Sequence, residues 1–362
     1  MTGESKATPS RPLVSVLLCV YNPGDGIAEC LRMVDTVRAA GVEVIVVDDG
    51  STDDTAERVA AWARTRPDAR LVVLPVNGGL GAARNVAIDA ASGEYYWFID
   101  WDDSWPSDAV EVLAEAASAT GADIVVGRTT WVSEDGDDLG RIEGYPRGLD
   151  VSGDDAFLML LRGDLKGYLW AKLIRRDLAT RFPFPPLREK ADICAFAKQL
   201  HHAEKVVGIE AEVYRHAIRP GSNSNRRTLD LGNVDRARES VAEEHAALVA
   251  HGAGDPLLML NYDYGMWHLA KVNTAHRLME PPVARQVARD TAAQMRFADV
   301  VSLTPRFPVT ALRSLLVLTF RGRYGLVRGG FTLMRAALRF GRRRMSSSGR
   351  PEATRDLPGV RT

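Results

Sequence analysis

Short apolar runs alternate with amphipathic helical stretches in the first part of the chain. Residues 13–20 (LVSVLLCV) and 42–47 (VEVIVV) are nearly continuous in hydrophobic side chains, which is typical of strands buried on both faces of a parallel sheet. Between them, Ile27, Leu31 and Val34 recur at the spacing of one helix face. Because this order repeats, the sequence predicts an α/β fold with a mostly parallel sheet flanked by helices.

Acidic residues follow two of the predicted strands. The second strand ends in DDGS at residues 48–51, and a later apolar run, YYWFI at 95–99, ends in DWDD at 100–103. In an open α/β sheet, ligands bind at the carboxyl ends of the strands. We therefore expect one site that is assembled from separate segments of the chain.

The segment DWDD crowds three carboxylates, Asp100, Asp102 and Asp103, with no Lys or Arg beside them in the sequence. Like charges at this spacing repel, and a divalent cation removes the penalty. Mg²⁺ and Mn²⁺ prefer such oxygen ligands and complete their shells with water and phosphate oxygens. The segment therefore predicts a metal site for a diphosphate substrate. For Asp103 alone, the sequence favours a cap on the following helix.

Two further segments are candidates for nucleotide binding. The Asp49 carboxylate at its strand end can accept a hydrogen bond from the N3–H of uracil, so it is the candidate base reader. In NGGLGAAR (77–84) the glycines permit close backbone approach to a ligand, and Arg84 can offset diphosphate charge. This segment follows the third strand and has Arg84 in place of the last glycine of a dinucleotide fingerprint, which argues against a nicotinamide enzyme.

Four motifs in this order resemble those of a family 2 glycosyltransferase of the GT-A fold. They are the run 16–22 with its CVYN ending, VDDGSTDDT at 47–55, NGGLGAARN at 77–85 and GEYYWFIDWDD at 93–103. The resemblance covers about residues 12–225. It implies the GT-A nucleotide-diphospho-sugar transferase fold, a nucleotide-sugar donor, a divalent metal and transfer with inversion at the anomeric carbon.

The resemblance also implies roles for individual residues. Tyr21 and Asp49 would hold the nucleoside, and Arg84 would lie near the nucleotide. Asp100 and Asp102 would form the metal-binding DxD motif, with Asp102 as the direct ligand and Asp100 also close to the donor nucleotide. The cofactor is then Mn²⁺ or Mg²⁺, and the favoured donor is a UDP-sugar.

The second half of the family pattern is present in weaker form. The segment LWAKL at 169–173 resembles W-N-K-L, and YRHAIRPGSNS at 214–224 resembles the family's Y-x-Y-R-x-R-x-G-S-x-S ending. The family's Glu-Asp pair is reduced to Asp192, which follows Ala191. An inverting transfer needs a base for the acceptor hydroxyl, and we assign this role to Asp192, with Glu189 as the alternative.

Three other residues are weaker candidates. Trp170 is a candidate for stacking on a sugar ring, and Lys172 for a phosphate contact, each against a packing or surface role. His216 is a candidate ligand of the metal or the diphosphate, although a lone histidine is more often structural. The pair His201-His202 shows no partner spacing that predicts a metal site.

The resemblance, together with these residues, implies an inverting, metal-dependent glycosyltransferase that acts on a hydroxyl of a glycan, a cell-wall polymer, a lipid-linked precursor or a natural product. One alternative is a sugar nucleotidyltransferase, which requires a basic Gly-rich loop after the first strand, where this chain has Asp25. The other is a degenerate module that binds nucleotide-sugar without turnover. The intact Asp49, Asp100, Asp102 and Asp192 argue against that alternative.

Composition changes near residue 225, beyond which Ala, Glu, Leu and Arg dominate and helices are favoured. We expect a disordered segment at 1–11, a GT-A domain at 12–227, a mainly helical C-terminal extension at 228–344 with a basic amphipathic end, and a flexible tail at 345–362.

Charge is distributed unevenly along the chain. Its 46 Lys and Arg nearly balance 47 Asp and Glu, which argues against a nucleic-acid binder, yet residues 301–362 hold 13 Arg against two acidic residues. An apolar stripe runs beside an Arg stripe within 312–344. This pattern fits an anionic membrane surface, and it also fits packing on the acidic body of the protein.

The sequence also indicates a compartment. Cys19, Cys30 and Cys194 lie in apolar contexts without zinc-binding spacing, and the first twelve residues are polar. The longest apolar stretch near the C-terminus is far shorter than the roughly 20 residues that span a bilayer. We expect a cytoplasmic protein, either free or peripheral on the cytoplasmic face of the cell membrane.

Overall fold

The computed structural model describes residues 13–37, 41–133, 136–142, 144–188, 190–218 and 231–320. The chain divides into two compact units, residues 1–267 and 268–362. The first helices of the predicted C-terminal extension therefore belong to the first unit. The predicted disordered segment at 1–11, the predicted flexible tail at 345–362 and the basic end from residue 321 onward lie outside the described residues.

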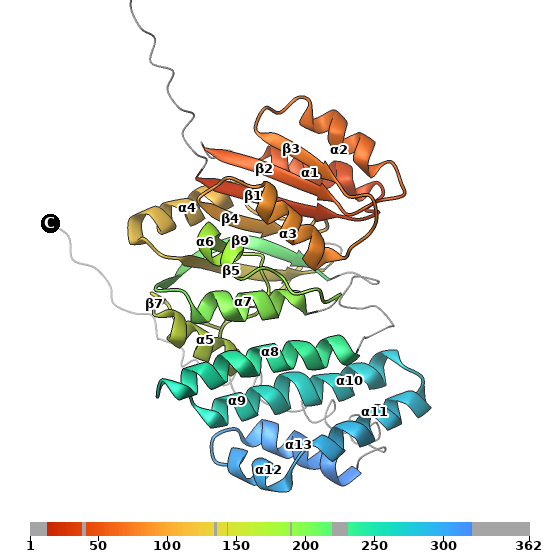
Figure 1. Ribbon diagram of the computed structural model, residues 1–362, viewed down its shortest axis with the longest axis vertical. Coiled ribbons are helices and arrows are strands. Elements are labelled where there is room, and N and C mark those ends of the chain that lie inside the picture. The colour runs from red at the N-terminus through yellow and green to blue at the C-terminus, as the bar shows by residue number, and fades with distance from the viewer. Residues whose placement is uncertain are drawn as a thin grey trace, which may run out of the picture. The chain divides into compact units, whose positions relative to one another are not determined.

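The first unit is built on one mixed sheet in the order β3-β2-β1-β4-β8-β5-β9-β7, with β6 paired to β5 (Figure 1). Its strands are β1 (Val14–Val20), β2 (Val42–Asp48), β3 (Ala69–Val73), β4 (Tyr95–Ile99), β5 (Ile124–Val132), β6 (Asp138–Arg141), β7 (Asp150–Val151), β8 (Lys172–Arg175) and β9 (Val206–Ala217). Strands β3, β2, β1 and β4 are parallel, as predicted. The predicted parallel order ends at β8, which lies antiparallel between β4 and β5.

Helices follow most strands of this unit. They are α1 (Gly26–Asp35), α2 (Thr55–Ala63), α3 (Leu80–Ala90), α4 (Ala109–Thr120), α5 (Gly153–Arg162), α6 (Arg176–Arg181), α7 (Ala191–His201), α8 (Leu231–Ala250) and α9 (Pro256–Tyr262). Helix α8 packs against α7, and α9 packs against α5 (Figure 1). These two helices add a further layer to the side of the sheet that carries α7.

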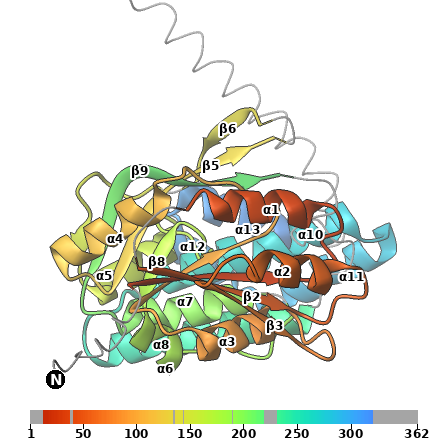
Figure 2. The same cartoon turned by 90° about the horizontal axis from the view of Figure 1, so that it is seen from above.

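Both faces of the central strands are covered, which explains their continuous apolar sequences. Val16 and Leu18 of β1 share a buried cluster with Ile27 and Val34 of α1. Leu17 points to the other face, where α3 packs against β1 and β2. Figure 2 shows α1 and α3 on opposite sides of these strands. The predicted α/β class is therefore confirmed.

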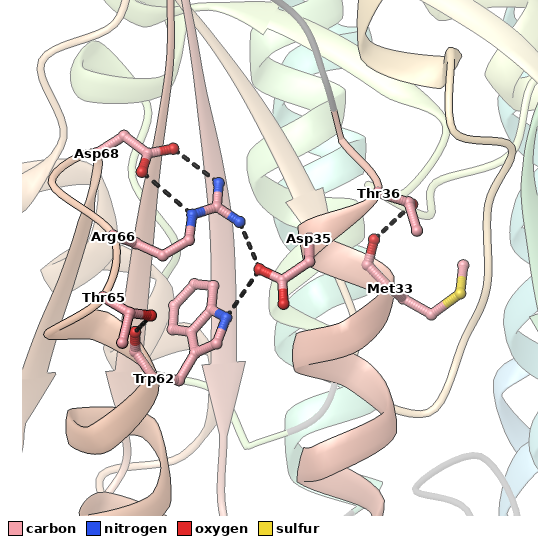
Figure 3. A network of polar contacts seen from close by, with 7 residues as sticks. All are labelled: Met33, Asp35, Thr36, Trp62, Thr65, Arg66 and Asp68. Carbon is pink, nitrogen blue, oxygen red and sulfur yellow. Dashed lines mark hydrogen bonds and ion pairs between the residues drawn. The ribbon is translucent and has the colours of Figure 1, made fainter.

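A polar network joins α1 to the turn between α2 and β3 (Figure 3). The Arg66 guanidinium lies 2.6 Å from Oδ1 of Asp35 and 2.7 Å from Oδ2 of Asp68. The Trp62 indole N–H donates to the same Asp35 oxygen at 2.9 Å. The hydrogen bonds from Arg66 to Asp68 and Asp35 outweigh partial burial and raise the pKa of Arg66. The network therefore connects two helices that cover the same edge of the sheet.

The second unit is helical and comprises α10 (Leu269–Leu278), α11 (Pro281–Gln294), α12 (Phe297–Leu303) and α13 (Pro308–Phe320). A π-helical turn, η2 (Asp263–His268), leads into it. Val287, Val300 and Val317 are buried within this unit. Among the described residues, no helix is long and apolar enough to cross a membrane.

Candidate active site

The loops that follow β1 and β2 are joined by side-chain hydrogen bonds. The Asn22 backbone N–H donates to Oγ of Ser51 at 3.0 Å, and Oδ1 of Asn22 accepts the Thr52 N–H at 2.8 Å. The candidate nucleoside-binding residue Tyr21 directly precedes this junction and is 42% exposed. Its ring is therefore available to a ligand at the edge of the site.

Asp49 binds the glycine-rich turn that precedes α3. Its Oδ1 accepts the Gly78 N–H at 2.8 Å, while Oδ2 accepts the Gly79 N–H at 2.9 Å and the Asn77 side-chain amide at 3.0 Å. Only 3% of Asp49 is exposed. A carboxylate offers about four acceptor positions, so three protein donors leave about one for a ligand. The sequence alone did not indicate this clamping contact.

Glycine is required where these two loops meet. Gly50 has a φ of +71°, and a Cβ atom there would lie 2.7 Å from the backbone carbon of Val76. Both the left-handed conformation and the close backbone contact exclude larger residues. The turn after β2 therefore packs directly on the segment that leads to the glycine-rich turn.

Arg84 of α3 reaches the acidic cluster that follows β4. Its side chain is almost completely buried, and Nη2 lies 3.2 Å from Oδ1 of Asp100. The carboxylates have no Lys or Arg beside them in the sequence, and this cation comes from a helix residue 16 positions earlier. Burial raises the pKa of Asp100 to about 6 despite the opposing Arg84 charge, and the charges of Asp103 and Asp102 add to the rise.

Asp102 and Asp103 take different positions in the turn after β4. Asp102 is half-buried, whereas the Asp103 side chain is fully buried. Asp103 is not a helix cap, because α4 begins six residues later at Ala109. Its Oδ1 accepts the Ala217 N–H at 2.9 Å, and its Oδ2 lies 3.0 Å from Nδ1 of His216. Asp103 therefore attaches this turn to the end of β9.

An aromatic stack lies beside the acidic turn. The Trp170 ring is stacked on Tyr168, Tyr214 and His216, with centroid distances of 4.5, 5.5 and 5.0 Å. The Tyr214 hydroxyl accepts the Asp100 backbone N–H at 2.9 Å. Sequence reasoning did not single out this role of Tyr214.

His216 has an electrostatic link to the acidic turn. Burial by itself lowers the pKa of His216, but the hydrogen bond to Asp103 and the charges of Asp103, Asp100 and Asp102 raise it above its usual value. The structure thus gives His216 a direct partner in Asp103, and it leaves metal or diphosphate binding by this residue as a hypothesis.

Two weaker candidates do not reach the surface. Trp170 is 4% exposed, and its neighbours in the stack are protein rings, so the structure favours the packing role over sugar stacking. Lys172 is fully buried in β8, with Nζ 5.1 Å from the centroid of the Phe196 ring. Of the two roles considered for Lys172, its burial inside the sheet favours packing over a phosphate contact.

Asp192 lies in the first turn of α7 and is half-buried. Two observations place this turn beside α3. A Cβ atom on Gly81 would lie 3.2 Å from Cβ of Ala191, and the Asn85 side chain exchanges hydrogen bonds with both backbone groups of Phe184, at 2.8 and 2.9 Å. The helix N-terminus stabilises a carboxylate at this position.

Asn85 is a second residue whose role the sequence did not reveal, although it belongs to the NGGLGAARN motif. Because it fixes the segment before α7, it brings the turn carrying Asp192 to the helix that carries Arg84. The alternative base, Glu189, lies outside the described residues.

Comparison with known proteins agrees with this geometry. Residues 15–180 match the profile of Glycosyl transferase family 2. The chain is 29% identical over 220 residues to the glycosyltransferase GlyG of Streptococcus pneumoniae, covering 58% of this chain and 72% of that protein. It is 29% identical over 324 residues to the putative glycosyltransferase EpsH of Bacillus subtilis, covering 85% of this chain and 91% of that protein. Residues 15–180 therefore match a glycosyl transferase family 2 domain, and these relatives support a glycosyltransferase.

Solved structures define the fold. The S. aureus TarS 1–349 structure in complex with UDP-GlcNAc superposes with a TM-score of 0.65 at 18% identity, covering 88% of this chain and 92% of that one. The TarS complex with UDP gives a TM-score of 0.66 at 19% identity. The predicted GT-A fold with a helical C-terminal region is confirmed.

Proposed function

We propose that this glycosyltransferase is inverting and metal-dependent, and that it transfers a sugar from a nucleoside-diphosphate donor, most favourably a UDP-sugar, to an acceptor hydroxyl. The acceptor classes are a glycan, a cell-wall polymer, a lipid-linked precursor and a natural product. The observation that carries the proposal is the convergence of Asp49, Arg84, Asp100 and the α7 turn with Asp192 around the start of α3.

The nucleoside would lie between the loops that follow β1 and β2. The exposed Tyr21 ring and the remaining acceptor position of Asp49 suit a base with an N–H donor, and uracil has one at N3. The TarS structures with UDP-GlcNAc and UDP support a uridine donor by analogy of fold. Buried Arg84, already paired with Asp100, would compensate negative charge close to the diphosphate.

The acidic turn suits a hard divalent ion. Asp102 and Asp100 provide carboxylate oxygens at one strand end. Burial raises the pKa of Asp100, and the charges of Asp103 and Asp102 add to the rise, so a divalent ion would favour the ionised carboxylates. When bound, Mn²⁺ or Mg²⁺ would act as a Lewis acid for the departing nucleoside diphosphate. Asp103 and Tyr214 would hold the turn in place through Ala217 and the Asp100 N–H.

Asp192 is the proposed base. As the acceptor oxygen forms its bond to the anomeric carbon, the bond from that carbon to the diphosphate oxygen breaks on the opposite face. The acceptor proton passes to the Asp192 carboxylate, and the nucleoside diphosphate departs with the bonding electrons. A carboxylate in the first turn of α7 beside the nucleotide-binding helix suits this role. Glu189 remains the alternative base.

A donor screen tests the proposed function. Each common nucleotide-sugar is incubated with the protein and Mn²⁺ without an acceptor, and release of nucleoside diphosphate is measured. We expect slow hydrolysis of one UDP-sugar. Binding without any release, even when acceptors are added, would favour the degenerate module, whereas formation of a nucleotide-sugar from a sugar phosphate would favour a nucleotidyltransferase.

A membrane surface is the proposed location of the second unit, on the cytoplasmic face. Val309 is 62% exposed and Leu312 47% exposed on α13, while Phe297 and Val301 are exposed on α12. Exposed apolar side chains on helices that precede, in the sequence, a segment rich in arginine favour binding to anionic headgroups. The competing hypothesis is that the basic segment packs on the acidic part of the chain.

A further inference from the structure

Side chains of types that can ligate a metal ion cluster at the end of α7 that is opposite to Asp192. His201 and the following His202 meet Glu244 of α8, and one potential ligand atom from each lies within 4.8 Å of the others. The packing of α7 against α8 brings them together (Figure 1). The sequence showed no such site, because the carboxylate belongs to another helix more than 40 residues later.

The two imidazole rings are held in fixed orientations. Nδ1 of His201 lies 3.0 Å from Oδ1 of Asp154 in α5, which favours a proton on Nδ1 and leaves Nε2 as the lone-pair nitrogen. The His202 ring is stacked on Phe182, with a centroid distance of 4.4 Å and an interplanar angle of 11°. A carboxylate behind a histidine is the usual outer contact of a metal-binding imidazole.

The third group, Glu244, makes only long contacts with its two charged or polar partners. Its side chain is 13% exposed, and its two oxygens lie 3.8 Å from Nε2 of His202 and 3.8 Å from Nζ of Lys198. Both distances exceed that of a hydrogen bond. A mostly buried carboxylate therefore lies close to the His202 ring without a hydrogen bond to it.

We propose that His201, His202 and Glu244 bind a divalent transition metal of the Zn²⁺ class and thereby link α7 to α8. Two imidazoles and one carboxylate are a borderline donor set, unlike the all-oxygen set of the acidic turn. A tetrahedral Zn²⁺ ion with bonds of about 2.0–2.1 Å requires ligand atoms roughly 3.3 Å apart. Side-chain rotation that moves Glu244 away from Lys198 would close the present separation.

Zinc titration of the Asp102→Ala protein tests the proposal, because this variant weakens the separate site of the acidic turn. Zn²⁺ is added in competition with a chromophoric chelator. We expect one ion to bind with micromolar or higher affinity. His202→Ala and the conservative Glu244→Gln, each added to Asp102→Ala, should weaken binding about 10-fold or more. The control His251→Ala changes an exposed histidine on the turn after α8 and should leave the affinity unchanged.

Thermal unfolding supplies a second readout. Zn²⁺ should raise the Tm of the Asp102→Ala protein and should not raise that of its Glu244→Gln derivative, because an ion that binds only the folded state stabilises it. The metal-free proteins should have similar Tm values, which separates ligand loss from misfolding. The proposal is overturned if Asp102→Ala binds no Zn²⁺ at tens of micromolar, or if Glu244→Gln and His202→Ala bind it as well as their parent.

Discussion

At the scale of single residues, Asp49 has one structural role and one proposed binding role. Its carboxylate holds the glycine-rich turn through Gly78 and Gly79, and it is also the proposed reader of the base. An amide in its place keeps the size of the side chain but turns one acceptor into a donor. The consequences of that change separate the two roles.

We predict that Asp49→Asn weakens UDP binding by about 10-fold or more and lowers stability by about 1–3 kcal/mol, because buried N–H groups lose an acceptor. Base reading predicts in addition that the preference for UDP over CDP disappears. Calorimetric titration with both nucleotides, beside the control Asp54→Asn, measures this. An equal weakening of both nucleotides with the preference intact would restrict Asp49 to the clamping role.

Asp192 provides the second prediction at this scale. Asp192→Asn should keep donor affinity and lose roughly 10²-fold or more in transfer rate, because the amide cannot take the acceptor proton. Single-turnover rates and donor binding are measured for Asp192→Asn and Glu189→Gln in parallel. Near-normal transfer by Asp192→Asn with a large loss in Glu189→Gln would assign the base to Glu189.

At the scale of secondary-structure elements, local patterns predicted most of the fold. Strands β1, β2 and β4 and helix α1 follow from apolar runs and helical spacing, which are properties of contiguous residues. Strand β8 is only four residues long, KLIR, and its antiparallel place between β4 and β5 depends on long-range pairing. No local pattern encodes that pairing.

In the candidate site too, the sequence reveals contiguous motifs but not contacts between distant residues. The motifs containing Asp49, Asp100 and Asp102 could be recognised because each is contiguous. The contacts of Asp103 with Ala217 and of Asn85 with Phe184 join residues about 100 or more positions apart, so the sequence does not show them. The sequence left both sugar stacking and packing open for Trp170, because its ring partners Tyr214 and His216 lie more than 40 residues later.

The network around Arg66 permits a prediction about these elements. Arg66→Gln should lower the free energy of unfolding by about 1 kcal/mol, because the guanidinium bonds to both Asp35 and Asp68 from a partly exposed position (Figure 3). Urea unfolding at low and high salt measures the loss. Arg64→Gln, at an exposed position two residues earlier, is the matched control. An equal effect of the two substitutions would contradict a specific role for the network.

At the scale of the whole molecule, we propose different functions for the two units. The first unit holds the proposed donor, metal and base residues, whereas the second presents exposed apolar side chains on α12 and α13. An enzyme with an acceptor at a membrane would benefit from a second unit that binds the surface. Membrane binding by the second unit would therefore favour an acceptor at a membrane.

We predict that the full-length protein sediments with anionic liposomes at low salt and is released by high salt, because electrostatic attraction to headgroups is screened. A protein that ends at Phe320, and the substitution Leu312→Glu within the full chain, should each bind more weakly. Asp290→Glu, at a polar position of α11, serves as the control. Equal recovery of all forms in the supernatant would favour packing of the basic segment on the protein.

The central claim is that the turn after β4 binds a divalent ion together with a nucleoside diphosphate. Calorimetric titration of UDP into the wild-type protein and into Asp102→Ala, each with and without Mn²⁺, tests it most directly. The account predicts that Mn²⁺ strengthens UDP binding by the wild type, and that Asp102→Ala folds normally but loses this metal-dependent gain. Asp102→Ala that binds UDP with an unchanged dependence on Mn²⁺ would contradict the account.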